Sequence, residues 1–161
     1  MAHELIDKYV TCVPLASETT GTNPFFSQDN AAEERFPVQL EASASSDEKP
    51  IVSELKGHAT DANVRPLFGK LVGMSSDGST VTIATAGQNM IFARGDTATA
   101  VTNAEIGRGV RASTTTGTNG EVVSGDGLNA RDALERGTIV GGNSETGTTD
   151  EPAYYRVSMP L

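Results

Sequence analysis

The chain has 161 residues, a formal net charge of −9 and a sequence pI near 4.6, and its length suits one domain with appendages. The acidity argues against nucleic acid and anionic membranes as partners, because both are negatively charged. The single cysteine, Cys12, excludes an intramolecular disulfide framework and a zinc-finger cluster, so a core with only 5% aromatic residues is expected to gain stability from oligomerisation.

The N-terminal region combines a short apolar run with a polar stretch. The run from His3 to Leu15 predicts a strand that breaks off near Pro14. From Ala16 to Arg35 the composition is polar, apart from the cluster Pro24-Phe25-Phe26, which is typical of a long loop or an extended arm. We therefore expect an N-terminal strand and arm over residues 1–35 and a body over 36–161.

The middle of the chain alternates in hydropathy with the period of a strand. Strands are predicted at Val38–Ala42, Pro50–Leu55, Leu67–Met74 and Thr80–Ala86. The tetrapeptide Ser75-Ser76-Asp77-Gly78 lies between the last two strands, and Asp-Gly pairs favour the positive φ of tight turns. A β-hairpin around Asp77-Gly78 is the strongest structural prediction from the sequence.

Short strands separated by Gly-bearing turns continue to the last residues. They are expected at Asn89–Ala93, Thr97–Thr102, Ile106–Ser113, Glu121–Val123, Thr138–Gly142 and Ala153–Met159. A short helix is expected over Ala130–Arg136, with Asn129 as its N-cap and Gly137 after its last turn. This regular recurrence of short strands and turns predicts an all-β fold. We expect a compact β-barrel, a β-tulip or a sandwich, with one short helix.

The sequence offers no constellation for catalysis, a metal or a cofactor. His3 and His58 have no second histidine at ligand spacing, and the Asp-Gly turns lack the closing Glu of an EF-hand loop. A P-loop and a Gly-x-Ser-x-Gly elbow are also absent. We therefore assign no catalytic, metal-ligating or cofactor-binding residue, and dispersed carboxylates leave a hydrolase as the weakest alternative.

Three arginines are candidates for contact with another subunit: Arg94, Arg108 and Arg111. The alternative is that they pair with acids or lie along a solvated strand face. The first residues lack the basic and apolar segments of a secretory signal, and no apolar stretch has the length of a membrane span. We expect synthesis in the cytoplasm and no membrane partner.

From Gly69 to Leu161 the chain resembles the small capsid decoration, or cement, proteins of tailed bacteriophages and related archaeal viruses. The segments that carry the resemblance are Val81–Thr85, Arg94–Thr97, Ile106–Val110, Gly137–Gly141 and Tyr155–Met159. The resemblance implies a compact β body, often trimeric, with no catalytic residue and no cofactor. It also implies a place on the capsid exterior, where such proteins bind the major capsid protein lattice and join neighbouring capsomers.

The expected function is therefore a virion protein that binds the major capsid protein and stabilises the head, as a homo-oligomer with a trimer favoured. Pro24, Phe25 and Phe26 are the candidate anchor on a neighbouring subunit, and the alternative is that both rings fold back onto the chain's own barrel. A different class remains open, a carbohydrate- or receptor-binding β module of a virion fibre or tail.

Overall fold

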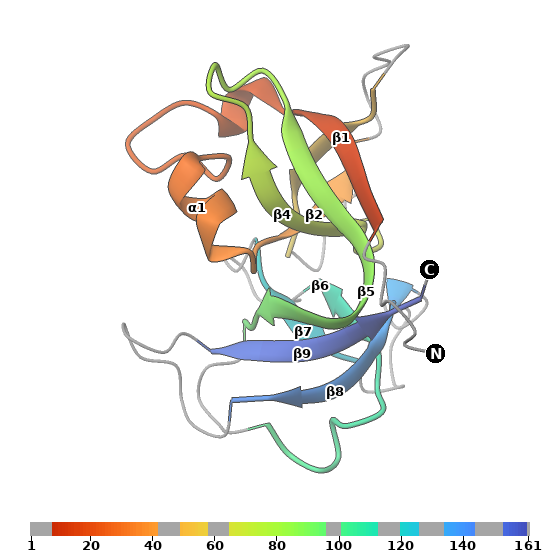
Figure 1. Cartoon of the computed structure of the whole chain (residues 1–161). Helices are drawn as coiled ribbons and strands as arrows, with labels where there is room; N and C mark the ends of the chain where they lie inside the picture. Colours follow the sequence, from red (N-terminus) through yellow and green to blue (C-terminus); the bar gives the residue numbers. More distant parts are fainter. Residues whose placement is uncertain are drawn as a thin grey trace.

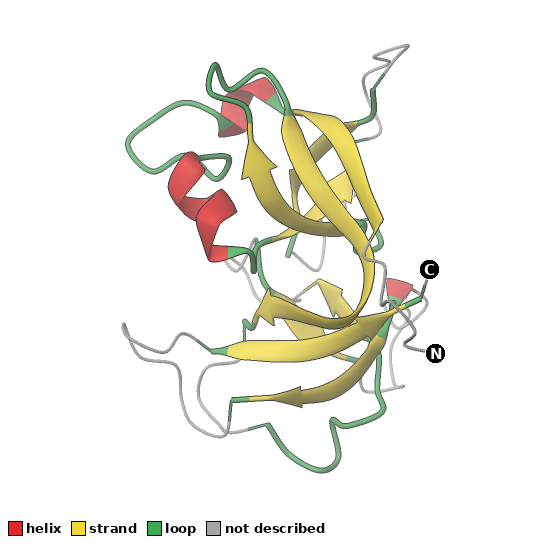
Figure 2. Cartoon of the chain, viewed as in Figure 1, coloured by secondary structure: helices red, strands yellow, loops and turns green. Residues whose placement is uncertain are grey.

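The protein is mostly strand (48%), as the sequence predicts. The computed structural model describes residues 8–41, 49–57, 65–95, 101–112, 120–125, 134–143 and 153–160. The strands are β1 (Lys8–Pro14), β2 (Pro37–Leu40), β3 (Ile51–Glu54), β4 (Gly69–Met74), β5 (Val81–Ala93), β6 (Val110–Ala112), β7 (Val122–Ser124), β8 (Thr138–Gly142) and β9 (Tyr154–Met159). In Figure 2 the described helices are short beside the strands, and the longest is α1 (Gln28–Glu33).

Five strands close into a barrel in the order β1-β3-β2-β4-β5, and β5 pairs back onto β1. All pairs in this barrel are antiparallel except β1 with β3. Closure leaves the barrel without a free edge strand, which removes the unpaired peptide groups that promote aggregation. The barrel core is made of small and aliphatic side chains with one fully buried aromatic ring: Cys12, Phe26, Ala31, Val38, Val52, Leu71, Val81 and Ile83.

The predicted hairpin joins β4 and β5. The Asp77 carboxylate accepts hydrogen bonds from the Ser79 backbone N–H (3.0 Å) and from the hydroxyls of Ser75 and Ser79 (both 2.8 Å). These bonds hold the pKa of Asp77 low, at about 2, with the backbone bond from Ser79 as the largest cause. Gly78 has φ of 73°, so the sequence places Gly where a Cβ would be strained.

The 13-residue strand β5 leaves this barrel and enters a second ring of strands (Figure 1). Its second half pairs with β9, which pairs with β8. A bridge between Val110 and Arg136 connects β6 to the start of β8, and a bridge between Arg94 and Val122 connects β7 to the end of β5. The sequence predicts two strands, Thr80–Ala86 and Asn89–Ala93, where the structure has one long strand.

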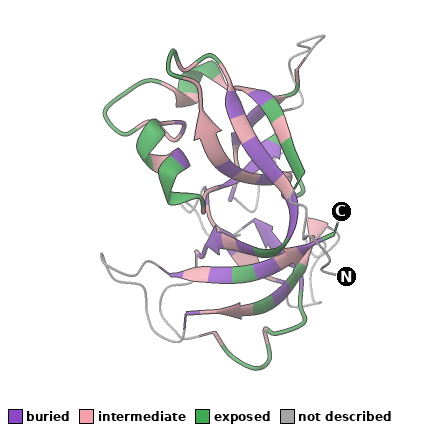
Figure 3. Ribbon diagram, in the orientation of Figure 1, coloured by how far each residue is buried: buried purple, intermediate pink, exposed green. Residues whose placement is uncertain are grey.

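The second ring has its own core, which mixes aliphatic, aromatic and thioether side chains. Its buried members are Leu55, Leu67, Ala84, Met90, Phe92, Val110, Ala112, Val122, Ile139, Tyr155, Val157 and Met159. Figure 3 shows buried bands alternating with intermediate and exposed bands along β9, the period-2 pattern of a strand with one face in the core. Arg156 lies on the exposed face of β9 between buried Tyr155 and Val157.

The N-terminal segment is part of the barrel, which corrects the expected boundary after residue 35. Strand β1 supplies one of the five strands, and α1 packs against β4 (Figure 1). The Ser27 hydroxyl accepts a hydrogen bond from the Asn30 backbone N–H (3.1 Å) and so begins α1. The described part of residues 1–35 is thus a barrel component, because its apolar side chains complete the core.

Two other predictions fall partly or wholly outside the described residues. The expected helix over Ala130–Arg136 has residues 130–133 outside the described ranges. The expected strand Thr97–Thr102 has residues 97–100 outside them, and its last two residues form no strand and precede the turn at 103–107.

Candidate functional site

The predicted anchor lies against the chain's own barrel. Phe26 is 1% exposed inside the barrel core, and Phe25 packs edge-on against both Phe26 and Phe36, with ring centroids 4.9 and 5.9 Å apart. Pro24 and Phe25 also line a hollow of about 330 Å³ beside Glu18. Phe26 is therefore unavailable as an anchor on another subunit. Its ring instead folds back onto the chain's own barrel, as in the alternative stated for this cluster.

The three predicted arginines do not share one surface. Arg94 and Arg111 are 2% and 5% exposed, whereas Arg108 is exposed. Arg108 donates from Nη1 to the Gly125 carbonyl (2.8 Å), and Arg111 donates from Nη1 to the Ala112 carbonyl (3.2 Å). Only Arg108 is placed to meet a partner, because the other two guanidinium groups lie inside the second ring.

Glu105, which the sequence did not single out, is the centre of a polar network. It lies in the turn before β6, and its carboxylate accepts hydrogen bonds from the hydroxyls of Tyr155 and Ser124. It also accepts from the backbone N–H and the hydroxyl of Thr102, at 2.6 and 3.2 Å. One side chain thereby fastens the turn to β9 and β7, and we call Glu105, Tyr155, Ser124 and Thr102 the Glu105 network.

The Glu105 network shifts the pKa of both its acidic groups. Burial alone would raise the pKa of Glu105, but the hydrogen bonds from Tyr155 and Thr102, with the charge of Arg94, lower it below the ordinary value. Burial and the bond to Glu105 raise the pKa of Tyr155. The Arg94 guanidinium lies over the Tyr155 ring, 5.4 Å from its centroid, so Glu105 is a carboxylate and Tyr155 a neutral donor at neutral pH.

The residue after Glu105 belongs to an exposed apolar pair. Ile106 and Val140 are 45% and 47% exposed, and we call them the apolar edge. The Gly107 N–H donates to the Ile139 carbonyl (2.9 Å), and the Ile139 N–H donates to the Arg108 carbonyl (2.7 Å). This is a β-bulge with Gly107 at φ of 89°. Ile106 precedes Gly107 and Val140 follows Ile139, so both exposed side chains belong to residues that adjoin these bonded peptides.

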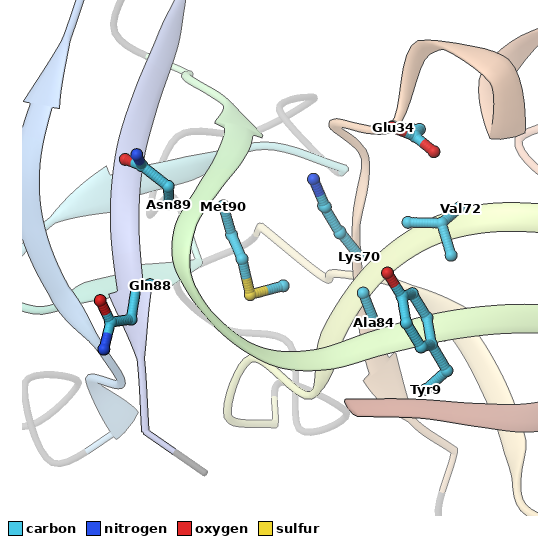
Figure 4. Close-up of a pocket in the computed structure, with 8 residues that line it drawn as sticks. All are labelled: Tyr9, Glu34, Lys70, Val72, Ala84, Gln88, Asn89 and Met90. Carbon is cyan, nitrogen blue, oxygen red and sulfur yellow. The ribbon is translucent and has the colours of Figure 1, made fainter. Parts of the chain in front are cut away.

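A pocket of about 230 Å³ lies where β5 bends from the barrel into the second ring. Figure 4 shows Lys70 between Met90 on β5 and Glu34 after α1, and it draws the Gln88 and Asn89 side chains on the far side of the β5 bend, pointing away from Lys70. Its full lining is Tyr9, Glu34, Lys70, Val72, Ala84, Gln88, Asn89 and Met90. We call it the junction pocket.

The described residues contain no group of three or more His, Cys, Asp or Glu side chains arranged to hold a metal ion. His3 and His58 lie outside the described ranges. Cys12 is buried in the barrel core, where desolvation raises the pKa of its thiol to about 11. None of the helices in the described ranges is long and apolar enough to cross a membrane.

No family model, curated protein or solved structure matches the chain significantly. The Glu105 network had no local signal in the sequence, because Tyr155 is 50 positions from Glu105. Ile106 was predicted as the start of a strand, whereas it lies exposed in the turn before β6.

Proposed function

We propose that this chain is a capsid decoration protein, which binds the outer surface of the major capsid protein lattice and stabilises the head. It acts as a homo-oligomer, with a trimer favoured, and it has no catalytic residue. The observation that carries the proposal is the apolar edge: Ile106 is exposed on the turn that the Glu105 network holds in place, and Val140 is exposed on β8, next to the Ile139 peptide that bonds to this turn.

The apolar edge suits attachment in many copies. Burying a Val or Ile side chain completely is worth about 1.5–3 kcal/mol, and Ile106 and Val140 are already about half buried. Covering both contributes on the order of 2–3 kcal/mol per copy, less than the entropy lost on association. A lattice of copies, each held by further contacts, turns such modest energies into firm attachment.

The Glu105 network supports this role by fixing the turn before any partner arrives. Glu105 bonds to Thr102 within the turn and to Tyr155 on β9. Part of the entropy of ordering this surface is therefore lost on folding and does not weaken binding. The net charge of −9 fits a position on the capsid exterior, away from the phosphates of packaged nucleic acid.

The test is to add purified protein to undecorated heads of its virus and to measure binding and the temperature at which the heads disrupt. We expect binding and a higher disruption temperature. The double variant Ile106→Ser, Val140→Ser should bind at least tenfold more weakly, since the lost apolar energy exceeds about 1.4 kcal/mol.

Leu40→Ser is the matched control, because Leu40 is an exposed apolar residue on β2 in the first barrel. It should bind as the unmodified protein does. Failure of the unmodified protein to bind heads at any salt concentration would overturn the proposal. If the double variant bound heads as tightly as the unmodified protein, the apolar edge would not be the surface that binds the capsid.

A further inference from the structure

The junction pocket has features that the proposed function does not use. The register of β5 against β9 shifts between Gly87 and Met90, so Gln88 and Asn89 protrude from the bend. Both side chains are exposed, and neither amide forms a hydrogen bond with any residue in the described ranges. Figure 4 draws both side chains pointing away from Lys70, so these two residues border the pocket at the bend and its polar lining groups are those of Tyr9, Glu34 and Lys70.

Glu34 reaches the pocket from a strained backbone conformation. It follows α1 with φ of 53° and ψ of 38°, and it is the one non-glycine residue with positive φ in the described ranges. Helices that end in this way usually have Gly or Asn at this position, because a Cβ is disfavoured there. The Glu34 carboxylate has no hydrogen bond or ion pair with any described residue, so folding alone does not account for Glu at this site.

The lining sets the chemical class of the ligand. Glu34 and Lys70 carry opposite charges on two walls, so a simple anion or cation would meet a like charge. Tyr9 adds a hydroxyl and an exposed ring, and the apolar lining comes from Val72, Ala84 and Met90. A ligand hydroxyl both donates and accepts hydrogen bonds, so it can pair with the acceptors and the donors of this lining. The C–H groups of the same ligand can contact the apolar lining atoms.

We propose that the junction pocket binds a neutral saccharide, with Glu34 accepting hydrogen bonds from its hydroxyls and Lys70 donating to them. The volume of about 230 Å³ is below the usual range for drug-sized ligands, so it accommodates a single sugar ring. A ligand of this size binds with a Kd on the order of millimolar. This inference is independent of capsid binding.

The test is to titrate the purified full chain with glucose, galactose, mannose and N-acetylglucosamine, one at a time, and to follow backbone amide chemical shifts. We expect saturable shifts for at least one sugar, centred on residues 88–90 and on Glu34. The variants Glu34→Gln and Glu34→Gly should each weaken that binding by about tenfold, the effect of one lost charge-assisted hydrogen bond.

Glu34→Gly also separates binding from folding. Gly relieves the left-handed backbone, so this variant should unfold at a higher temperature while binding the sugar less well. Asp29→Asn is the matched control, since Asp29 is an exposed carboxylate on α1 and outside the pocket. It should bind as the unmodified chain does.

Two results would overturn the inference. One is the absence of saturable shifts with all four sugars at concentrations well above millimolar. The other is unchanged affinity in both Glu34 variants. Either result would leave the capsid-binding proposal intact, because binding to heads is measured separately and depends on Ile106 and Val140.

Discussion

Replacing Glu105 by Gln measures how strongly the Glu105 network holds the turn before β6. The carboxylate accepts four hydrogen bonds, and an amide keeps only one of the two accepting oxygens. The variant also removes the negative charge near buried Arg94. With hydrogen bonds to charged groups worth about 1.5–3 kcal/mol and the site half-buried, we expect a loss of about 2–3 kcal/mol.

In a chain of this size that loss lowers the Tm by roughly 4–12 °C, measured by circular dichroism at neutral pH. The folded-state pKa of Glu105 is lowered, so its contribution is present above the unfolded value of about 4.3 and is lost as the pH falls through the folded value. The difference in Tm between the two proteins should therefore shrink on acidification below pH ~4.

Glu33→Gln is the control, because Glu33 is an exposed acid on α1 and belongs to a surface ion pair with Arg35. Its Tm should stay within about 2 °C of the unmodified protein. A Glu105→Gln protein with an unchanged Tm at neutral pH, or a difference in Tm that is constant on acidification, would refute the reasoning.

Two further predictions concern the first barrel. Phe26→Ala should lower the free energy of unfolding by about 3–5 kcal/mol in urea titrations, because it leaves a cavity in the core, and a loss below about 1 kcal/mol would mean that Phe26 is not a core residue. The Cys12 thiol should react slowly with iodoacetamide in the native protein at pH 8 and quickly in denaturant, because burial raises its pKa to about 11. Rapid native labelling would contradict its buried position.

Much of the strand pattern was predictable from the sequence because its signals are local. The hairpin around Asp77-Gly78 depends on turn chemistry within four residues, and the alternation in β9 depends on the six residues Tyr154–Met159. β1 ends at Pro14, as expected. Each of these features is fixed by neighbours in the chain, so one sequence contains the necessary information.

The arrangement of the strands was not predictable, because it depends on contacts between distant residues. Closure of the barrel pairs Cys12 with Val81, and no local pattern specifies that partner. The polar composition of residues 16–35 suggested an arm, yet Phe26 and Ala31 place this segment in the barrel core. The rest of the segment stays polar because it covers the outside of the barrel.

The candidate site was largely missed for the same reason. Arg94 was predicted as a surface contact, whereas it lies inside the second ring over the ring of Tyr155. Ile106 was predicted at the start of a strand, whereas it lies in the turn before β6, and Val140 is exposed because it follows buried Ile139 on the outward face of β8. The roles of these residues depend on contacts with residues that are distant in the sequence, so a local pattern does not reveal them.

The proposed function requires that the chain attach to a capsid through its apolar edge. The most direct measurement is hydrogen exchange of backbone amides in the free protein and in the protein bound to undecorated heads. Slower exchange on binding should concentrate in residues 104–109 and in β8, Thr138–Gly142. Head binding without slower exchange in either segment, or with protection confined to the first barrel, would contradict the account.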